Sequence, residues 1–345
     1  MINIVYASSD SFCGIAGISI LSVCKNSKSP KDIAFYMISS GITEENRIRL
    51  KKMVEGYGSR IIIIDPPDIE KTAGVRIDTG RWHISTFYRL FLGTILPEEI
   101  QKVLYIDCDT IVRRDLAPLW EMDMKGKWLY GVDDCRSAAY RTELGLSEND
   151  RYINNGVLLI DLQAWRENGV EKMCADFIRE RGGDITYVDQ GVQNGVLSGL
   201  GKTGCLPPKY NALTILFAFD YDSLMKLRRP PVPMGREEYR EAVNSPYIVH
   251  FQSCFKMGKR PWMKGCTHPF ASEYRLYKDS SPWREDPYMP DDRTLPQKAL
   301  GAAAGTIPET MMIGFISFLH AKVYPTARQI KQRTKTAREK ERDVF

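Results

Sequence analysis

The sequence predicts an α/β protein with a mostly parallel central sheet. Six short runs rich in β-branched residues recur along the first half of the chain, and helix-like segments separate the first three of them. This alternation is typical of a doubly wound sheet. A chain of 345 residues is long enough for one large domain with an appendage, or for two domains. The share of hydrophobic residues, 43%, is ordinary for a globular protein.

The predicted elements follow one another in a simple order. The strands are residues 2–7, 32–39, 60–65, 102–107, 128–133 and 155–161. Apolar residues three and four apart predict helices over 14–27 and 43–58, and Thr43 begins the second with a capping pattern. We expect a further helix over 81–96, because Phe87, Leu90, Phe91 and Ile95 would share one face.

The C-terminal region differs from the rest of the chain. Residues 278–297 are rich in Pro and Asp without periodicity, which predicts a linker between a domain at 1–277 and a C-terminal element at 298–345. That element begins with an amphipathic helix whose apolar residues are Met311, Met312, Phe315, Ile316, Phe318 and Leu319. Such a helix suits the headgroup region of an anionic membrane, and the alternative is that it packs on the domain.

Charge is concentrated in the tail. Residues 322–345 carry eight basic and three acidic side chains, a net charge of +5, which equals the net charge of the whole chain. The rest of the chain is therefore neutral overall, which argues against a nucleic-acid-binding surface. The eight cysteines are scattered without a Cys-x-x-Cys pair, and the N-terminus does not resemble a signal peptide. We therefore expect a cytoplasmic protein that is peripherally attached to the inner face of the membrane.

Two acids end the strand at 102–107. Asp107 and Asp109 are one residue apart, so in extended backbone they point the same way. The carboxyl ends of parallel strands are where α/β proteins bind ligands. Paired carboxylates at such a place predict a site for Mg²⁺ or Mn²⁺, which usually completes its shell with phosphate oxygens. The alternative is that one Asp caps the next element and the other is solvated.

Four later stretches carry polar residues in apolar or glycine-marked surroundings: "YINNGVLLIDL", "YVDQGVQNGVL", "IVHFQ" and "KRPW". In this order after "LYIDCDTIV", they resemble retaining glycosyltransferases of family 8, which include bacterial lipopolysaccharide galactosyl- and glucosyltransferases and glycogenin. The resemblance covers residues 1–270. It implies a GT-A type, Rossmann-like domain that binds Mn²⁺ or Mg²⁺ and transfers galactose or glucose from a UDP-sugar. The acceptor would be a glycan or glycolipid of a bacterial cell surface.

The resemblance also implies roles for individual residues. It makes His250 the third metal ligand beside Asp107 and Asp109, and it makes Asn154, Asp189 and Gln190 the catalytic residues around the sugar. The implied nucleotide-sugar-binding residues are Ala7, Ser9, Asp10, Arg89, Asp107, Cys108, Asp134, Asn155 and Arg260. Simpler structural alternatives exist for several of these: a turn at Asn154–Gly156, a helix cap at Asp189, a turn at Asp134 and a surface charge at Arg89.

This chain departs from the family pattern at two places. Ser9 and Ser11 stand where the family often has Asp and Asn, and this departure weakens the implied recognition of uracil. The loop before "RPW" is longer than usual, and Lys256 and Lys259 compete with Arg260 for a diphosphate oxygen.

Two other functions remain open from the sequence, a haloacid-dehalogenase-like phosphatase and a non-catalytic sugar-nucleotide-binding protein. Retention of configuration requires either a protein nucleophile or attack from the face of the leaving group, and the poor nucleophilicity of an amide such as Gln190 favours the second.

Overall fold

A computed structural model describes residues 1–80, 82–303, 306–319 and 323. Its centre is a seven-stranded sheet with the order β3-β2-β1-β4-β7-β6-β8. The strands are β1 (Ile2–Ser9), β2 (Ile33–Ser40), β3 (Arg60–Ile64), β4 (Lys102–Ile106), β6 (Leu129–Asp133), β7 (Ile153–Asp161) and β8 (Thr203–Cys205). All six predicted strands are therefore present, and the α/β class is confirmed.

The direction of one strand could not be foreseen. β1, β2, β3 and β4 pair in parallel, and so do β6 and β8, but β7 runs antiparallel to both β4 and β6. The start of β7 therefore lies at the same edge of the sheet as the end of β4. A second sheet has the order β5-β10-β9 and consists of β5 (Thr110–Val112), β10 (Ile248–His250) and β9 (Ala212–Leu213).

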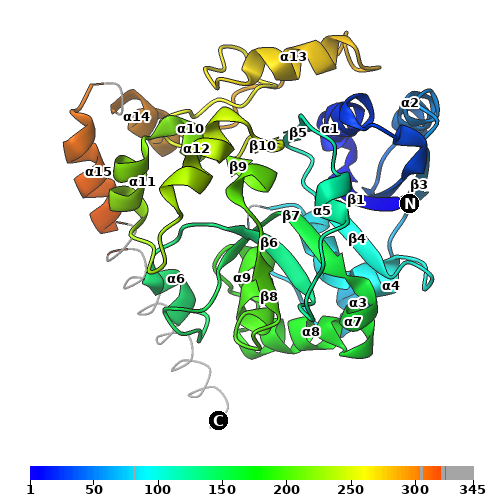
Figure 1. The fold of residues 1–345 in the computed structure, drawn as a ribbon, viewed down its shortest axis with the longest axis horizontal. Coiled ribbons are helices and arrows are strands. Elements are labelled where there is room, and N and C mark those ends of the chain that lie inside the picture. Colours follow the sequence, from blue (N-terminus) through cyan, green and yellow to red (C-terminus); the bar gives the residue numbers. More distant parts are fainter. Residues whose placement is uncertain (81, 304–305, 320–322, 324–345) are drawn as a thin grey trace, which may run out of the picture.

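Helices cover both faces of the main sheet (Figure 1). One face packs against α3 (Ile69–Ala73), α4 (Leu92–Ile95), α7 (Leu162–Glu167), α8 (Val170–Glu180) and α9 (Val188–Leu197). The other packs against α1 (Cys13–Asn26), α2 (Glu44–Glu55) and α5 (Ala117–Trp120). Alternate strand residues supply the two cores: Val103 and Tyr105 face one way, Leu104 and Ile106 the other.

The remaining helices lie beyond the sheet. They are α6 (Ala138–Thr142), α10 (Thr214–Ala218), α11 (Tyr221–Arg228), α12 (Arg236–Asn244), α13 (Ala271–Asp279), α14 (Leu295–Ala303) and α15 (Glu309–Phe318). Four short 3₁₀ helices complete the described chain: η1 (Asp10–Phe12), η2 (Pro30–Asp32), η3 (Ile84–Phe91) and η4 (Pro208–Asn211).

The helix predicted over 81–96 is wrong in type. Residues 84–91 form the 3₁₀ helix η3, and only the short α4 that follows is an α-helix. The Arg89 side chain explains part of this winding, because its Nε donates a hydrogen bond to the Thr86 carbonyl oxygen at 3.0 Å. In an α-helix that carbonyl would accept from the amide of Leu90.

The segment predicted as a linker packs closely on the domain. Trp283 is buried, its ring lies against Gly14 and Gly17 of α1, and its Nε1 donates to Asn46 of α2 at 2.9 Å. A Cβ on Gly17 would lie 2.1 Å from the Trp283 ring, so no larger residue fits there. The division of the chain into domains stays a prediction, but this segment contributes to the core.

The C-terminal helix α15 is present and lies beside α11 (Figure 1). Met312, Ile313 and Ile316 are buried in a cluster that includes α11, whereas Phe315 and Phe318 remain exposed. The predicted basic tail, 322–345, lies outside the described residues apart from position 323. Within the described ranges, every helix is too short or too polar to cross a bilayer.

Candidate active site at the edge of the sheet

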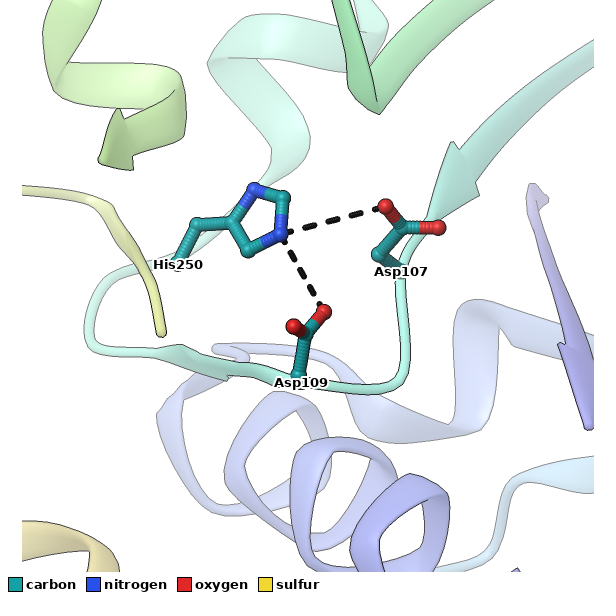
Figure 2. Close-up of side chains that lie close together, drawn as sticks. All are labelled: Asp107, Asp109 and His250. Carbon is teal, nitrogen blue, oxygen red and sulfur yellow. Dashed lines mark ion pairs between the residues drawn. The ribbon is translucent and has the colours of Figure 1, made fainter. Parts of the chain in front are cut away.

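Two acids and one histidine converge at the carboxyl end of β4. Asp107 follows β4, Asp109 precedes β5, and His250 ends β10 (Figure 2). His250 Nε2 lies 3.1 Å from Asp109 Oδ1 and 3.8 Å from Asp107 Oδ2. One ligand atom from each residue lies within 4.8 Å of the others. The structure thus brings together the three residues predicted to bind a metal.

Backbone hydrogen bonds hold the two acids in place. The Asp107 amide donates to the Gly156 carbonyl oxygen at 2.8 Å, and the Phe251 amide donates to the Asp109 carbonyl oxygen at 2.9 Å. β5 also pairs with β10, which sets Thr110 opposite His250. The positions of the carboxylates are therefore fixed by the two sheets.

Asn211 orients the histidine, a role that the sequence analysis missed. Its Oδ1 lies 2.9 Å from His250 Nδ1 and can only accept, so Nδ1 carries the proton and Nε2 is left to bind a metal. Gly156 leaves room for the ring, because a Cβ there would lie 2.3 Å from His250 Cε1. The stretch "PPKYNALT" has no pattern that distinguishes Asn211 from an ordinary loop residue.

The charges of Asp109 and His250 support each other. Burial by itself would raise the pKa of Asp109, but His250 and Arg260 outweigh it, and the pKa is lowered. Burial by itself would lower the pKa of His250, but Asp109 and Asp107 outweigh it, and the pKa is raised. Each of the two groups therefore favours the charged form of the other.

The donor set fits a divalent cation. Among the described residues, Asp107, Asp109 and His250 are the one group of at least three potential ligands close enough to share an ion. Two carboxylates and one imidazole suit Mn²⁺, whereas Mg²⁺ favours oxygen ligands alone. A cation bound here would replace the proton on His250 as the counter-charge.

Metal affinity should therefore depend on pH. A metal binds the neutral imidazole, so below the raised pKa of His250 the proton competes with the cation. We expect the dissociation constant for Mn²⁺ to rise by up to about tenfold per pH unit as the pH falls below that pKa, and to level off above it. Calorimetric titration with MnCl₂ between pH 5.5 and 8.5 measures this slope. His250→Ala should bind more weakly and lose this slope, and an equal slope in both proteins would contradict the prediction.

Arg89 connects the metal acids to Asp189. Its Nη2 donates to Asp107 Oδ1 at 2.8 Å, and its Nε lies 3.1 Å from Asp189 Oδ2. The guanidinium is buried and stands 4.4 Å from the centre of the Tyr105 ring. The alternative of a surface charge is thus wrong. Burial lowers the pKa of Arg89, but Asp107, Tyr105 and Asp189 outweigh it, so the guanidinium stays charged.

Asp189 lies in the first turn of α9 and is buried. Its Oδ2 accepts a hydrogen bond from Asn155 Nδ2 at 3.0 Å, in addition to the contact with Arg89. Burial raises its pKa, although Arg89 and Asn155 oppose this effect. Tyr187 and Val188, just before it, both have a positive φ, which is unusual for a β-branched residue. This strained turn aims the start of α9 at the site.

A chain of amides continues from the histidine toward β6. Asn211 Nδ2 donates to Asn154 Oδ1 at 2.8 Å, and Asn154 Nδ2 donates to Gln190 Oε1 at 3.2 Å. Gln190 Nε2 then donates to Asp134 Oδ2 at 2.8 Å. Asn154 and Asn155 lie inside β7, so the alternative of a turn at these residues is wrong. Gly156 does not have a positive φ either, so a turn does not require glycine here. Glycine is needed because a side chain would collide with the His250 ring.

Of the three N-terminal residues predicted to bind the nucleotide sugar, Ala7 lies next to the metal acids, whereas Asp10 has a structural partner elsewhere. The Ala7 carbonyl oxygen accepts from Cys108 Sγ at 3.2 Å, next to the two metal acids, and burial raises the pKa of Cys108. Ser9 Oγ lies 3.1 Å from Ser11 Oγ at the end of β1. Asp10, by contrast, accepts from the Thr43 amide and hydroxyl and from the Asn46 amide group, each at 2.8 Å. Asp10 thus stabilises the start of α2.

Each of the three basic residues of the long loop has a partner. Arg260 pairs with Asp292. It also lowers the pKa of Asp109, although its effect is smaller than those of burial and of His250. Lys256 Nζ lies 2.8 Å from Glu309 of α15, and Lys259 donates to a carbonyl oxygen at 3.0 Å. Arg260 is therefore the best placed of the three to reach a ligand at the metal acids.

Comparison with known proteins identifies the family to which this chain belongs. A model of glycosyl transferase family 8 matches residues 3–265, which is most of the chain. The chain belongs to glycosyl transferase family 8. This membership confirms the resemblance drawn from the motifs and excludes the phosphatase alternative.

Two relatives have low sequence identity to this chain, but the similarity extends over most of its length. General stress protein A of Bacillus subtilis is 26% identical over 82% of this chain and 95% of its own length. A lipopolysaccharide 1,2-glucosyltransferase of Escherichia coli is 22% identical over 83% of this chain and 80% of its own length. The similarity therefore extends over more than four fifths of this chain.

The fold agrees with this membership. The crystal structure of the galactosyltransferase LgtC in complex with donor and acceptor sugar analogues superimposes with a TM-score of 0.68. That structure is 27% identical in sequence, and the match covers 82% of this chain and 99% of LgtC. The chain thus has the GT-A fold of a family 8 glycosyltransferase.

Proposed function

We propose that the chain is a metal-dependent, retaining hexosyltransferase that moves galactose or glucose from a UDP-sugar to a bacterial glycan or glycolipid. The observation that carries the proposal is one connected network at the edge of the sheet. It runs from the acids and His250 through Arg89 to Asp189, and through Asn211 and Asn154 to Gln190 and Asp134. A cation bound by the acids and a sugar bound by the amides would therefore be neighbours, which supports the proposal.

The two parts of the network suit the two ends of a nucleotide sugar. A divalent cation held by Asp107, Asp109 and His250 would offset the negative charge that develops on the UDP leaving group. Arg260 would bind a diphosphate oxygen from the loop that follows β10. This requires it to exchange Asp292 for the phosphate.

The sugar end would be held by Asn154, Asn155, Asp189 and Gln190. These side chains are connected to one another by hydrogen bonds, so their orientation is set before the sugar arrives. The Asp189 carboxylate is committed to Arg89 and Asn155, which makes it a weak nucleophile. The amide of Gln190 is weaker still. Both facts support attack on the face of the leaving group, with retention of configuration.

A donor assay tests this function directly. UDP release from UDP-galactose and UDP-glucose should depend on Mn²⁺ and stop on treatment with EDTA. With a sugar acceptor, the product of an α-linked donor should be α-linked by NMR. If the protein bound a donor but released no UDP, with or without Mn²⁺, it would instead be a non-catalytic sugar-nucleotide-binding protein. A β-linked product would contradict retention.

We further propose that α15 attaches the enzyme to the inner face of the membrane, where a lipopolysaccharide-like acceptor is made. Met311, Phe315 and Phe318 are spaced at i, i+4 and i+7 and are exposed by 67%, 61% and 55%. At helical spacing they lie on the side opposite the buried Ile313 and Ile316. A two-sided apolar helix of this kind can pack on a domain and still insert into a headgroup region. The basic residues that follow it in the sequence would add about 1 kcal/mol each on anionic lipid.

Exchange of the exposed stripe should therefore remove membrane binding. We expect the wild-type protein to sediment with phosphatidylglycerol-containing liposomes at low salt. The triple variant Met311→Gln, Phe315→Gln, Phe318→Gln should stay in the supernatant with its donor hydrolysis intact. Leu276→Gln on α13, which is equally exposed at 67%, is the matched control and should still sediment. Sedimentation of the triple variant would contradict the proposal.

A further inference from the structure

Two arginines stand beside the sugar end of the site, and their charge exceeds that of the nearby acid. Arg136 follows β6 and is only 12% exposed at its side chain. Its Nε lies 3.2 Å from Asp134 Oδ2, without the geometry of a hydrogen bond. Its guanidinium lies 4.6 Å from the centre of the Tyr187 ring. Arg136 is thus held between Asp134 and Tyr187, the first residue of the strained turn before Asp189.

Arg228 lies on α11, the helix that packs against the end of β6. Leu224, one turn earlier on this helix, lines a small cavity together with Asp134 and Cys135, which puts α11 against the end of β6. The pKa of Arg228 is lowered by burial and by Arg136, while Asp134 opposes the effect. Within the described part of the chain, no carboxylate pairs with Arg228, and its shielded Nε has no hydrogen-bond acceptor.

Other groups nearby do not supply the missing negative charge. Asp133 pairs with Arg151 at 2.6 Å. Asp134 is shared between Arg136 and Gln190, and its Oδ1 is buried without a partner. Two guanidinium groups therefore have one carboxylate, Asp134, to compensate them, and the Nε atoms of both are shielded from water. An uncompensated charge is costly there unless a ligand brings a counter-charge.

We propose that Arg136 and Arg228 bind an oxyanion, either a carboxylate or a phosphate, on a sugar that enters beside Gln190. Guanidinium groups bind both oxyanions through paired hydrogen bonds, and an aromatic ring beside them suits the face of a sugar. This inference rests on the proposed function and refines its substrate class. The acidic sugar is either the transferred residue, as a uronic acid, or the acceptor.

Substrate pairs that differ only in charge separate these sources. In the donor arm, UDP release with Mn²⁺ is compared between UDP-glucose and UDP-glucuronic acid, and between UDP-galactose and UDP-galacturonic acid. In the acceptor arm, a neutral donor is offered with methyl glucoside, methyl glucoside 6-phosphate or methyl glucuronide. We expect the acidic member of at least one arm to have a kcat/KM about tenfold or more above its neutral counterpart, as for a group that gains a buried charge pair.

Variants then assign the preference to the two arginines. In Arg228→Met and in Arg136→Met, the ratio of acidic to neutral kcat/KM should fall by about tenfold or more, and Arg228→Lys should retain part of it. Lys226→Met, on the exposed side of the same helix, should keep the wild-type ratio. An unchanged ratio in folded Arg228→Met and Arg136→Met would overturn the assignment.

The ratio of acidic to neutral kcat/KM in the wild-type protein tests the inference even if the variants fail to fold. A preference for the neutral substrate in both arms, with UDP release intact, would overturn the inference and leave the proposed function standing. An absence of UDP release from every donor would instead refute the proposed function.

Discussion

Asp109→Asn should reduce UDP release by more than about a hundredfold. Loss of a residue that only hydrogen-bonds to a metal ligand typically costs about 10–100-fold in activity, and loss of the ligand itself should cost more. The amide keeps the shape of the side chain but loses the charge that both the cation and His250 require. The fold should survive, since Asp109 is held through its main chain by Phe251. Turnover with saturating Mn²⁺, together with thermal unfolding, measures both effects.

Glu121→Gln is the matched control for this substitution. Glu121 is an exposed acid at the end of α5, away from the metal acids, and its exchange should leave turnover within experimental error. If Asp109→Asn retained normal turnover and normal dependence on Mn²⁺, the assignment of Asp107, Asp109 and His250 as a metal site would be wrong.

Arg89→Met should lower the free energy of unfolding by about 3–5 kcal/mol, the usual cost of leaving a buried charge without its partner. Arg89 is the residue through which Asp107 and Asp189 are both compensated, and its Nη1 also donates to the Asn155 carbonyl oxygen at 2.6 Å. Methionine fills the space but leaves the buried Asp189 and the partly buried Asp107 without the cation between them. Urea denaturation in the absence of metal measures the loss.

A surface pair provides the comparison. Arg151 pairs with Asp133 at 2.6 Å but is 46% exposed, so Arg151→Met should cost no more than about 1 kcal/mol. Addition of Mn²⁺ should restore part of the stability of Arg89→Met, because a cation compensates Asp107. A loss of the same small size in both variants would show that Arg89 is not the electrostatic centre of the site.

The sequence alone predicts the elements better than their arrangement. Every predicted strand exists, because β-branched runs of this length have few other stable structures. Asp107 and Asp109 do converge as expected, but a bend between β4 and β5 brings them together, not the extended backbone that the sequence predicted. The antiparallel direction of β7 does not follow from its composition, which is the same in either direction. Trp283 shows a second limit: its surroundings are polar and rich in proline, yet its ring packs on α1.

The supporting residues of the site were also beyond reach from the sequence. Asn211 contacts His250 across a gap of 39 positions in the chain, and α11, which carries Arg228, packs against the end of β6. Contacts of this kind depend on how the two sheets and α11 pack together. A single sequence carries no periodic signal for them.

The reversed strand β7 has a consequence for how this enzyme can change. Its register with β4 sets Val157 opposite Ile106, and at the β-bulge its pairing with β6 passes from Leu158 directly to Asn154. Between these two points lie Asn155 and Gly156. A residue inserted or deleted here would reverse the direction in which each asparagine points and break its contact with Gln190 or Asp189. New specificity can thus arise in loops of variable length, but β7 can change only by substitution.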